Sequence, residues 1–357
     1  MERTQWGQPA EPAPRWRTLL DRALLGGSDE HRQVASRDEH RQAASRDEHR
    51  QVASRPRVAS PRSGGAPVDG WQASYPAQVE WRQAAAPDER TNVAIATLRR
   101  ELTSSRVLAF ANPKGGVHKT TATALAAATI GSVRGRGVLA WDDNELRGTL
   151  GLRAGSARHA RTIRHLIANL AEVEASSGSR LMDAIDDYLR HASDGTYDVL
   201  AGEESPRFAQ RLDQYTVRRV LELLRRTHDV ICVDTGNNVE SANWQTVLRA
   251  TDQLVVTTVP REDAAFTADW MLDLLHELGL GQVVSQAVTL LSCATPGHQP
   301  LLEDLRAHFA GRTRAVVVVP YDPALESGSS IEPAMLRPAT RQAWLHATAV
   351  MLDPLTR

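Results

Sequence analysis

The sequence predicts an α/β protein with a doubly wound, mostly parallel sheet flanked by helices and preceded by a disordered N-terminal region. Three observations lead to this fold class. From about Val93 onward, short runs of valine and leucine alternate with longer helical patterns, which is typical of a parallel sheet covered on both faces. A glycine-containing loop within residues 110–121 joins the first of these runs to an alanine-rich helix. Residues 29–55 instead repeat a charged nine-residue unit.

The first part of the chain, residues 1–92, is predicted to be a low-complexity and mostly disordered arm. The units DEHRQVASR, DEHRQAASR and DEHRQVASR follow one another at residues 29–55. Nine residues make about two and a half helical turns, so successive copies would face opposite sides of a helix and form no continuous apolar stripe. Little apolar area remains to offset the entropy of ordering. Residues 15–27 have helical apolar spacing, which fits either a docking peptide or a minor helix, and the arm is a candidate site for a protein partner.

The second part, residues 93–357, is predicted to be one folded domain that opens with a helix ending near Ser104. Strands are expected at Val107–Asn112, Gly137–Trp141, Asp229–Asp234, Gln253–Val259, Ala287–Ser292 and Ala315–Pro320. Helices are expected at residues 120–130, 162–170, 180–190, 215–226, 267–278, 301–308 and 338–352, with one more near Trp244.

Composition excludes several classes of protein. The formal net charge of −1 provides no global attraction to nucleic acid or membrane. The only cysteines, Cys232 and Cys293, lie in separate apolar runs, which argues against a zinc or iron–sulfur site and favours a reducing compartment. No apolar run approaches 18 residues, and the N-terminus has no apolar signal core, so we expect a cytoplasmic protein without a transmembrane segment.

The distribution of lysine identifies the loop FANPKGGVHKTT as unusual. Of 42 basic residues only two are lysines, Lys114 and Lys119, and both lie in this loop. A compact ammonium suits phosphate oxygens packed among backbone N–H groups better than the wide guanidinium fork does. A strand that leads through such a loop into a helix also presents N–H groups and the positive helix end to an anion. The loop is therefore predicted to bind phosphate.

The same loop resembles the deviant phosphate loop of the ParA/MinD family of P-loop ATPases, whose pattern is KGGxGKT[ST]. The matching residues are Lys114, Gly115, Gly116, Lys119, Thr120 and Thr121. The resemblance extends over about residues 105–352: residues 137–151 resemble the first switch of the family, residues 228–238 its Walker B strand and second switch, and residues 316–325 its nucleotide-base loop. It implies a doubly wound fold of the P-loop NTPase type, with ATP and Mg²⁺ as ligands and a face-to-face homodimer that hydrolyses ATP slowly.

The resemblance also implies roles for individual residues. Lys119 would bind the β- and γ-phosphates, and Lys114 would cross the dimer interface to the nucleotide of the partner. The metal residues would be Thr120, Asp142 and Asp234, and the catalytic residues Lys114, Asp142 and Asn144. Nucleotide binding is assigned to Lys114, Gly115, Gly116, Val117, His118, Lys119, Thr120 and Thr121, together with Pro320, Tyr321 and Asp322 at the base loop.

Two positions depart from the family pattern. His118 stands where the family has a small residue that lets the backbone approach phosphate, and its side chain would either crowd the ligand or donate a hydrogen bond to it. Asn144 stands at the second acidic position of the first switch. An amide does not accept a proton as a carboxylate does, so hydrolysis is expected to be slow or to need a partner.

Two functions follow from the sequence. The first is a Mg–ATP-dependent dimerising switch ATPase in plasmid or chromosome partitioning or in positioning of a cellular assembly. Its candidate DNA contacts are the arginines of residues 153–165 and 218–226, although a solvated helix surface explains such clusters equally well. The alternative is a non-hydrolysing or weakly hydrolysing nucleotide-sensing scaffold that recruits partners to a secretion or conjugation apparatus.

Overall fold

A computed structural model describes residues 89–144, 148–154, 161–192, 195–203 and 213–356. Its first helix, α2 (Glu89–Arg99), begins before the predicted boundary at Val93 and ends before Ser104. Residues 89–92, predicted to belong to the disordered arm of residues 1–92, lie in this helix, and residues 1–88, which include the repeats, lie outside the described residues.

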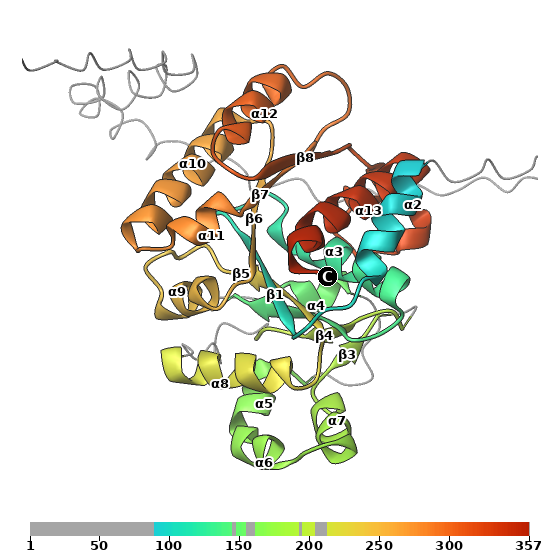
Figure 1. Ribbon diagram of the computed structural model, residues 1–357, viewed down its shortest axis with the longest axis vertical. Helices are drawn as coiled ribbons and strands as arrows, with labels where there is room; N and C mark the ends of the chain where they lie inside the picture. The colour runs from blue at the N-terminus through green and yellow to red at the C-terminus, as the bar shows by residue number, and fades with distance from the viewer. Residues whose placement is uncertain (1–88, 145–147, 155–160, 193–194, 204–212, 357) are drawn as a thin grey trace, which may run out of the picture. The chain divides into compact units, whose positions relative to one another are not determined.

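The domain is built on an eight-stranded sheet (Figure 1). The strand order is β3-β4-β2-β5-β1-β6-β7-β8, and every neighbouring pair is parallel except β3 and β4. The strands are β1 (Arg106–Ala111), β2 (Val138–Asp143), β3 (Arg190–His191), β4 (Asp198–Leu200), β5 (Val230–Thr235), β6 (Gln253–Thr258), β7 (Val288–Ser292) and β8 (Ala315–Val319). The fold class predicted from the sequence is confirmed.

Helices cover both faces of the sheet. One face is covered by α3 (Lys119–Arg134) and α13 (Pro338–Leu352), with α2 packed on both, and the other by α9 (Ala242–Arg249), α10 (Glu262–Glu277), α11 (Gly281–Ser285) and α12 (Leu302–Ala310) (Figure 1). The remaining helices are α4 (Leu150–Arg153), α5 (Ile163–Ala168), α6 (Leu170–Ala175), α7 (Ser179–Asp186) and α8 (Gln214–Arg225). The 3-10 turns are η1 (Pro323–Leu325), η2 (Pro333–Met335) and η3 (Asp353–Leu355).

Small residues let α3 pack closely against the sheet. Alanines 122, 124 and 126–128 of this helix are buried against apolar strand residues such as Phe110 and Cys232. A Cβ atom at Gly131 would lie 2.2 Å from the carbonyl oxygen of Thr196, so only glycine fits there. Gly135 then ends the helix in the left-handed region, and its N–H donates to the carbonyl of Gly131. These contacts fix the helix whose N-terminus carries the phosphate loop.

The sequence predicted all six long strands to within two residues at each end and missed the short pair β3 and β4. That pair joins Arg190 and His191 to the strand 198–200, and two polar residues offer no strand pattern to read. Helix α10 starts at Glu262 rather than at Thr267, because Glu262 and Asp263 favour the positive end of its first turn. The helix expected at 162–170 is split at Asn169 into α5 and α6. No helix in the described parts of the chain is both long and apolar enough to cross a bilayer.

Candidate functional site

The phosphate-loop residues lie at the carboxyl end of β1, where the chain turns into α3. A buried side chain shapes this turn: the Asn112 Oδ1 atom accepts from the N–H of Lys114 at 2.9 Å, and the Nδ2 atom donates to the carbonyls of Thr257 and Ala264 at 2.8 and 3.3 Å. Asn112 therefore connects the loop to β6 and to α10 through hydrogen bonds. The sequence alone predicts no role for Asn112.

His118 adopts the backbone conformation that glycine has in this type of loop. Its φ of 65° is the only positive φ among the non-glycine residues that the structure describes. For an L-residue this left-handed region costs about 1–2 kcal/mol. His118 is also the residue immediately before α3, and its carbonyl accepts from the N–H of Ala122 at 2.8 Å. Burial and, secondarily, the charge of Arg153 lower the pKa of its imidazole, which favours the neutral ring.

Lys119 places a buried ammonium group in the mouth of the loop. Its Nζ atom donates to Asn237 Oδ1 and, at 3.1 Å, to the carbonyl of Lys114. Within the described residues no carboxylate lies at ion-pair distance from it, and burial lowers its pKa while the charge of Asp234 acts in the opposite direction. A buried cation held only by neutral oxygens is suited to receive an anion.

Thr120 and Asp234 form an oxygen-rich corner beside this ammonium. The Thr120 hydroxyl donates to Asp234 Oδ2 at 2.6 Å, while Asp234 Oδ1 is buried and has no hydrogen-bond partner among the described residues. Burial, followed by the charge of Asp142, raises the pKa of Asp234. A carboxylate oxygen without a partner next to a hydroxyl fits a hard divalent cation such as Mg²⁺, which would supply the missing positive charge.

Asp142 lies beside Asp234, but its carboxylate accepts hydrogen bonds from backbone N–H groups of its own loop. The two residues are register partners on β2 and β5. The Asp142 carboxylate accepts from the N–H of Asn144 at 3.1 Å and from the N–H of Leu150 at 2.9 Å. A Cβ atom at Gly148 would lie 2.8 Å from Asp142 Oδ2, so a glycine is required for this close approach. Asp142 thus shapes the first-switch loop and raises the pKa of Asp234 from a distance.

Most of the predicted site residues line two adjoining cavities. The first, of about 250 Å³, is lined by Gly115, Gly116, His118, Lys119, Thr120 and Thr121 of the loop, and by Asn144, Thr149, Arg153, Asp234, Thr235 and Asn237. The second, of about 210 Å³, is lined by Pro320, Tyr321 and Asp322, by Ser292 and Cys293 after β7, and by Trp344, and it shares His118, Thr121 and Arg153 with the first. The loop residues and the base-loop residues, far apart in the sequence, therefore border one elongated site.

Four residues of the first cavity were not assigned to the site from the sequence: Thr149, Arg153, Thr235 and Asn237. Asn237 follows Asp234 by three positions, so its place after a strand end was visible, but its contact with Lys119 was not. Thr149 lies within the segment that resembles the first switch, and Arg153, two residues after it, belongs to a cluster predicted as candidate DNA contacts. Among the described residues, Asp142 and Asp143 do not line either cavity.

Comparison with known proteins agrees with this geometry at the level of the fold. The MinD cell division ATPase of Pyrococcus furiosus matches 68% of this chain and 98% of its own, with a TM-score of 0.54 and 21% identity. A ParA family ATPase of Chlorobium tepidum matches 70% of this chain and 98% of its own, with a TM-score of 0.54 and 18% identity. This chain has the ParA/MinD fold.

Sequence comparison is less direct. No protein-family profile matches the chain. The ESX-1 secretion-associated protein EspI of two Mycobacterium tuberculosis strains is 26% identical over 294 residues, which are 81% of this chain and 42% of EspI. The chain thus spans less than half the length of the curated relatives that it matches.

The other loop lysine of this ParA/MinD fold turns away from both cavities. The Lys114 Nζ atom lies 3.2 Å from Asp263 Oδ2 at the start of α10, and its side chain is 41% exposed. Asp263 also pairs with Arg261, and these contacts, that of Arg261 first, lower the pKa of Asp263 to about 2. Val117 is likewise outside the cavities, buried against Val259 and Ala264. Lys114 is therefore held on the surface of its own subunit.

The base-loop residues have internal partners. The Asp322 carboxylate accepts from the N–H of Ala324 at 3.0 Å and from the N–H of Arg337 at 2.8 Å, and the Tyr321 hydroxyl donates to Glu326 at 2.9 Å. Hydrogen bonds to the N–H of Arg337, the Thr340 side chain and the N–H of Ala324 outweigh the effect of burial and lower the pKa of Asp322. Asp322 therefore holds the loop in shape.

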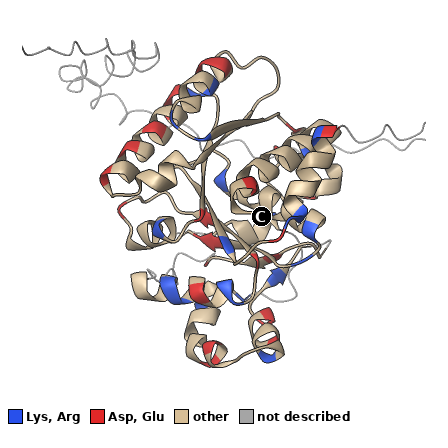
Figure 2. Cartoon of the chain, in the orientation of Figure 1, with Lys and Arg blue, Asp and Glu red and all other residues tan. Residues whose placement is uncertain are grey.

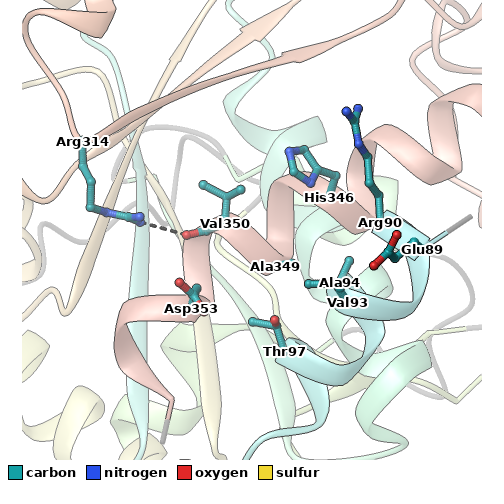
Figure 3. A pocket seen from close by; sticks show the side chains of 10 residues that line it. All are labelled: Glu89, Arg90, Val93, Ala94, Thr97, Arg314, His346, Ala349, Val350 and Asp353. Carbon is teal, nitrogen blue, oxygen red and sulfur yellow. Dashed lines mark hydrogen bonds between the residues drawn. The ribbon is translucent and has the colours of Figure 1, made fainter.

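A larger cavity of about 490 Å³ lies between α2 and α13 and contains none of the predicted site residues (Figure 3). Its wall combines the apolar side chains of Val93 and Val350 with charged groups, among them Arg314, which donates to the carbonyl of Val350 at 2.8 Å. Size alone therefore does not mark the site. The first cavity at the phosphate loop, although smaller, combines the Lys119 ammonium, the Thr120 hydroxyl and the Asp234 carboxylate.

The arginine clusters proposed for DNA contact mostly bond within the domain. Arg219 pairs with Glu174, and Arg226 donates to the carbonyls of Glu174 and Ser176. Arg225 pairs with Asp252 at 3.1 Å. Figure 2 shows both blue and red segments along α8, and the acidic partners Glu174 and Asp252 lie outside this helix. In the other cluster, residues 155–160 lie outside the described residues. The described arginines at and just after α8 thus mainly form ion pairs and hydrogen bonds within the domain.

Proposed function

We propose that this chain is a Mg–ATP-dependent switch ATPase of the ParA/MinD type. The observation that carries the proposal is the first cavity, where the buried Lys119 ammonium, the Thr120 hydroxyl and the unpartnered oxygen of Asp234 meet at the N-terminus of α3. Each group has the charge and chemistry that a nucleotide phosphate or its metal ion needs. The fold shared with the MinD and ParA family ATPases supports the same function.

The proposed roles follow from the contacts. Lys119 exchanges Asn237 and the Lys114 carbonyl for the β- and γ-phosphate oxygens, and the N–H groups of the loop bind the same oxygens. Thr120 and Asp234 hold Mg²⁺, which supplies positive charge to the phosphates. Asn144, at the edge of the cavity, orients the attacking water, and its amide keeps turnover slow. The MinD of Pyrococcus horikoshii, with a TM-score of 0.53, was crystallised with Mg-ADP.

Dimerisation is the second part of the proposal. In a face-to-face dimer, Lys114 leaves Asp263 and reaches the phosphates bound by the partner subunit. Breaking the ion pair with Asp263 costs little free energy, because an ion pair between two half-exposed side chains contributes about 0–1 kcal/mol. The dimer would then act in partitioning or in positioning another assembly inside the cell.

A second function is favoured by the curated relative. EspI is described as ESX-1 secretion-associated, and His118 and Asn144 both depart from the pattern of hydrolysing members. The alternative is therefore a nucleotide-sensing scaffold that binds ATP, hydrolyses it weakly or not at all, and recruits partners to a secretion apparatus.

The first experiment measures the molar mass of the full chain in solution with Mg–ATP, with Mg–ADP and without nucleotide. The full chain is used because α2 packs on α3 and α13, and a truncation inside α2 would disturb that contact. Wild type should dimerise with Mg–ATP alone, Lys119→Ala should neither bind nor dimerise, and Lys114→Ala should bind ATP as a monomer. Failure of wild type to bind ATP would refute both functions.

A turnover assay then separates the two functions. Phosphate release from Mg–ATP that rises on addition of DNA or a partner protein supports the switch ATPase. Tight binding with no release under any of these conditions supports the scaffold.

A further inference from the structure

Three side chains line both cavities of the nucleotide site, and one of them, Arg153, carries a fixed charge. Arg153 is the last residue of α4, the short helix that follows the first switch, whereas His118 and Thr121 belong to the loop and to the first turn of α3. These residues mark the boundary where the phosphate cavity opens into the cavity of the base loop. A ligand that occupies both cavities must pass Arg153.

The Arg153 guanidinium is partly buried and lacks an acidic partner. Within the described residues no carboxylate lies at ion-pair distance from it, in contrast to Arg106, Arg219 and Arg312, which pair with Asp252, Glu174 and Asp269. Burial lowers the pKa of Arg153. Removing a cation from water without a counter-charge is unfavourable, and an anion at this boundary would offset that cost.

The backbone around Arg153 is held from two sides. The N–H of Leu150, at the start of α4, donates to Asp142 on β2 at 2.9 Å, and the carbonyl of Arg153 accepts from the N–H of Ile331 at 2.8 Å. One side-chain nitrogen, Nη1, donates to the carbonyl of Ser329 at 3.2 Å. A guanidinium has five N–H donors, so most of its donors remain available to a ligand.

We propose that Arg153 binds the α-phosphate of the nucleotide and thereby joins recognition of its phosphates to recognition of its base. The inference rests on the proposed function. With the terminal phosphates at Lys119 and the base at Tyr321, the α-phosphate and the ribose lie at the boundary. Of these two groups only the α-phosphate is an anion, and the planar guanidinium is suited to bind two of its oxygens. Arg153 then contributes to affinity for a complete nucleotide and little to affinity for either half alone.

The test measures competition against a fluorescent ATP analogue on the full chain with Mg²⁺. Wild type, Arg153→Gln and Arg153→Lys are compared with the control Arg164→Gln, which removes an arginine of α5 that pairs with Glu203 at 3.2 Å and lines neither cavity. The competitors are ATP, pyrophosphate as the terminal phosphates alone, and adenosine. Arg153→Gln should raise the inhibition constant of ATP roughly tenfold or more, as expected for a hydrogen bond to a charged group. The constants for pyrophosphate and adenosine should not change, Arg153→Lys should retain part of the ATP affinity, and Arg164→Gln should match wild type.

Other outcomes overturn the inference in distinguishable ways. If wild type does not bind ATP, the proposed function itself fails. If wild type binds and Arg153→Gln binds equally well, only the Arg153 assignment fails. Equal losses for ATP and pyrophosphate would place the contact at the terminal phosphates. Equal losses for ATP and adenosine, with a lower unfolding temperature, would mean that Arg153 only holds residues 327–331. If Arg153→Gln does not fold, Arg153→Met replaces it. Equal losses of ATP affinity in Arg153→Lys and Arg153→Met would then overturn the proposed contact between the Arg153 charge and the α-phosphate.

Discussion

The two ends of the proposed nucleotide site differ in how their polar groups are satisfied. At the phosphate end, the hydrogen-bond partners of Lys119 within the described parts of the chain are neutral oxygens, and one oxygen of Asp234 has no partner there. At the base-loop end, both Asp322 oxygens accept backbone N–H groups and Tyr321 bonds to Glu326. Charges that lack internal partners are available for a ligand, whereas charges that have them stabilise the loop. Substitutions at the two ends should therefore affect different measurements.

The largest effect is expected for Lys119→Ala. Loss of the buried ammonium should weaken ATP binding about 100-fold or more, because at least two hydrogen bonds to charged oxygens are lost. The free energy of unfolding should not fall, since no carboxylate of the described residues lies at ion-pair distance from this buried cation. Calorimetric titration with ATP and urea unfolding measure the two quantities. Unchanged ATP affinity would remove the proposed phosphate role of the loop.

The next effect concerns the metal. Chelation of Mg²⁺ should weaken ATP binding to wild type by about tenfold or more, as expected when a counter-charge on phosphate is lost. Asp234→Asn keeps the shape of the side chain and should bind ATP with the same weak affinity whether or not Mg²⁺ is present. The measurement is ATP affinity with and without chelator for both proteins. A full Mg²⁺ response in Asp234→Asn would show that the metal is held elsewhere.

A smaller effect of a different kind is expected for Asp322→Ala at the base-loop end. Loss of two N–H acceptors should lower the free energy of unfolding by about 1–2 kcal/mol, while pyrophosphate competition stays as in wild type. The matched control is Asp353→Ala, which breaks an exposed pair with Arg100 and should cost less than about 1 kcal/mol. If Asp322→Ala instead abolished ATP binding without loss of stability, the contrast between the two ends would be wrong.

The smallest effect is expected for His118→Gly. Glycine accepts the left-handed backbone at this position, so the free energy of unfolding should rise by about 1 kcal/mol. ATP affinity measured alongside decides what the imidazole does. Unchanged or tighter binding would mean that His118 only occupies space, and weaker binding would mean that it contacts the ligand.

Prediction from the sequence succeeded where one local signal sufficed. Continuous apolar runs such as residues 230–233 identify central strands regardless of context, because both faces of a parallel sheet are buried. The short strands β3 and β4 carry no such signal. They pair at the sheet edge, where His191 bonds to Asp198 at 2.7 Å and His228 bonds to the same carboxylate at 3.3 Å.

The sequence by itself determined the sheet, the phosphate loop and the positions of Lys119, Thr120 and Asp234, because a strand, a loop and a helix in direct succession leave little choice of geometry. Only the tertiary structure decided which neighbours these groups meet. It turned Lys114 toward Asp263, directed Asp142 to the backbone of its own loop, and brought Arg153 and Asn237 to the cavity. The positions of Lys114, Arg153 and Asn237 depend on segments that follow different strands, and the distance between these segments is set by the order of strands in the sheet and not by their order in the chain.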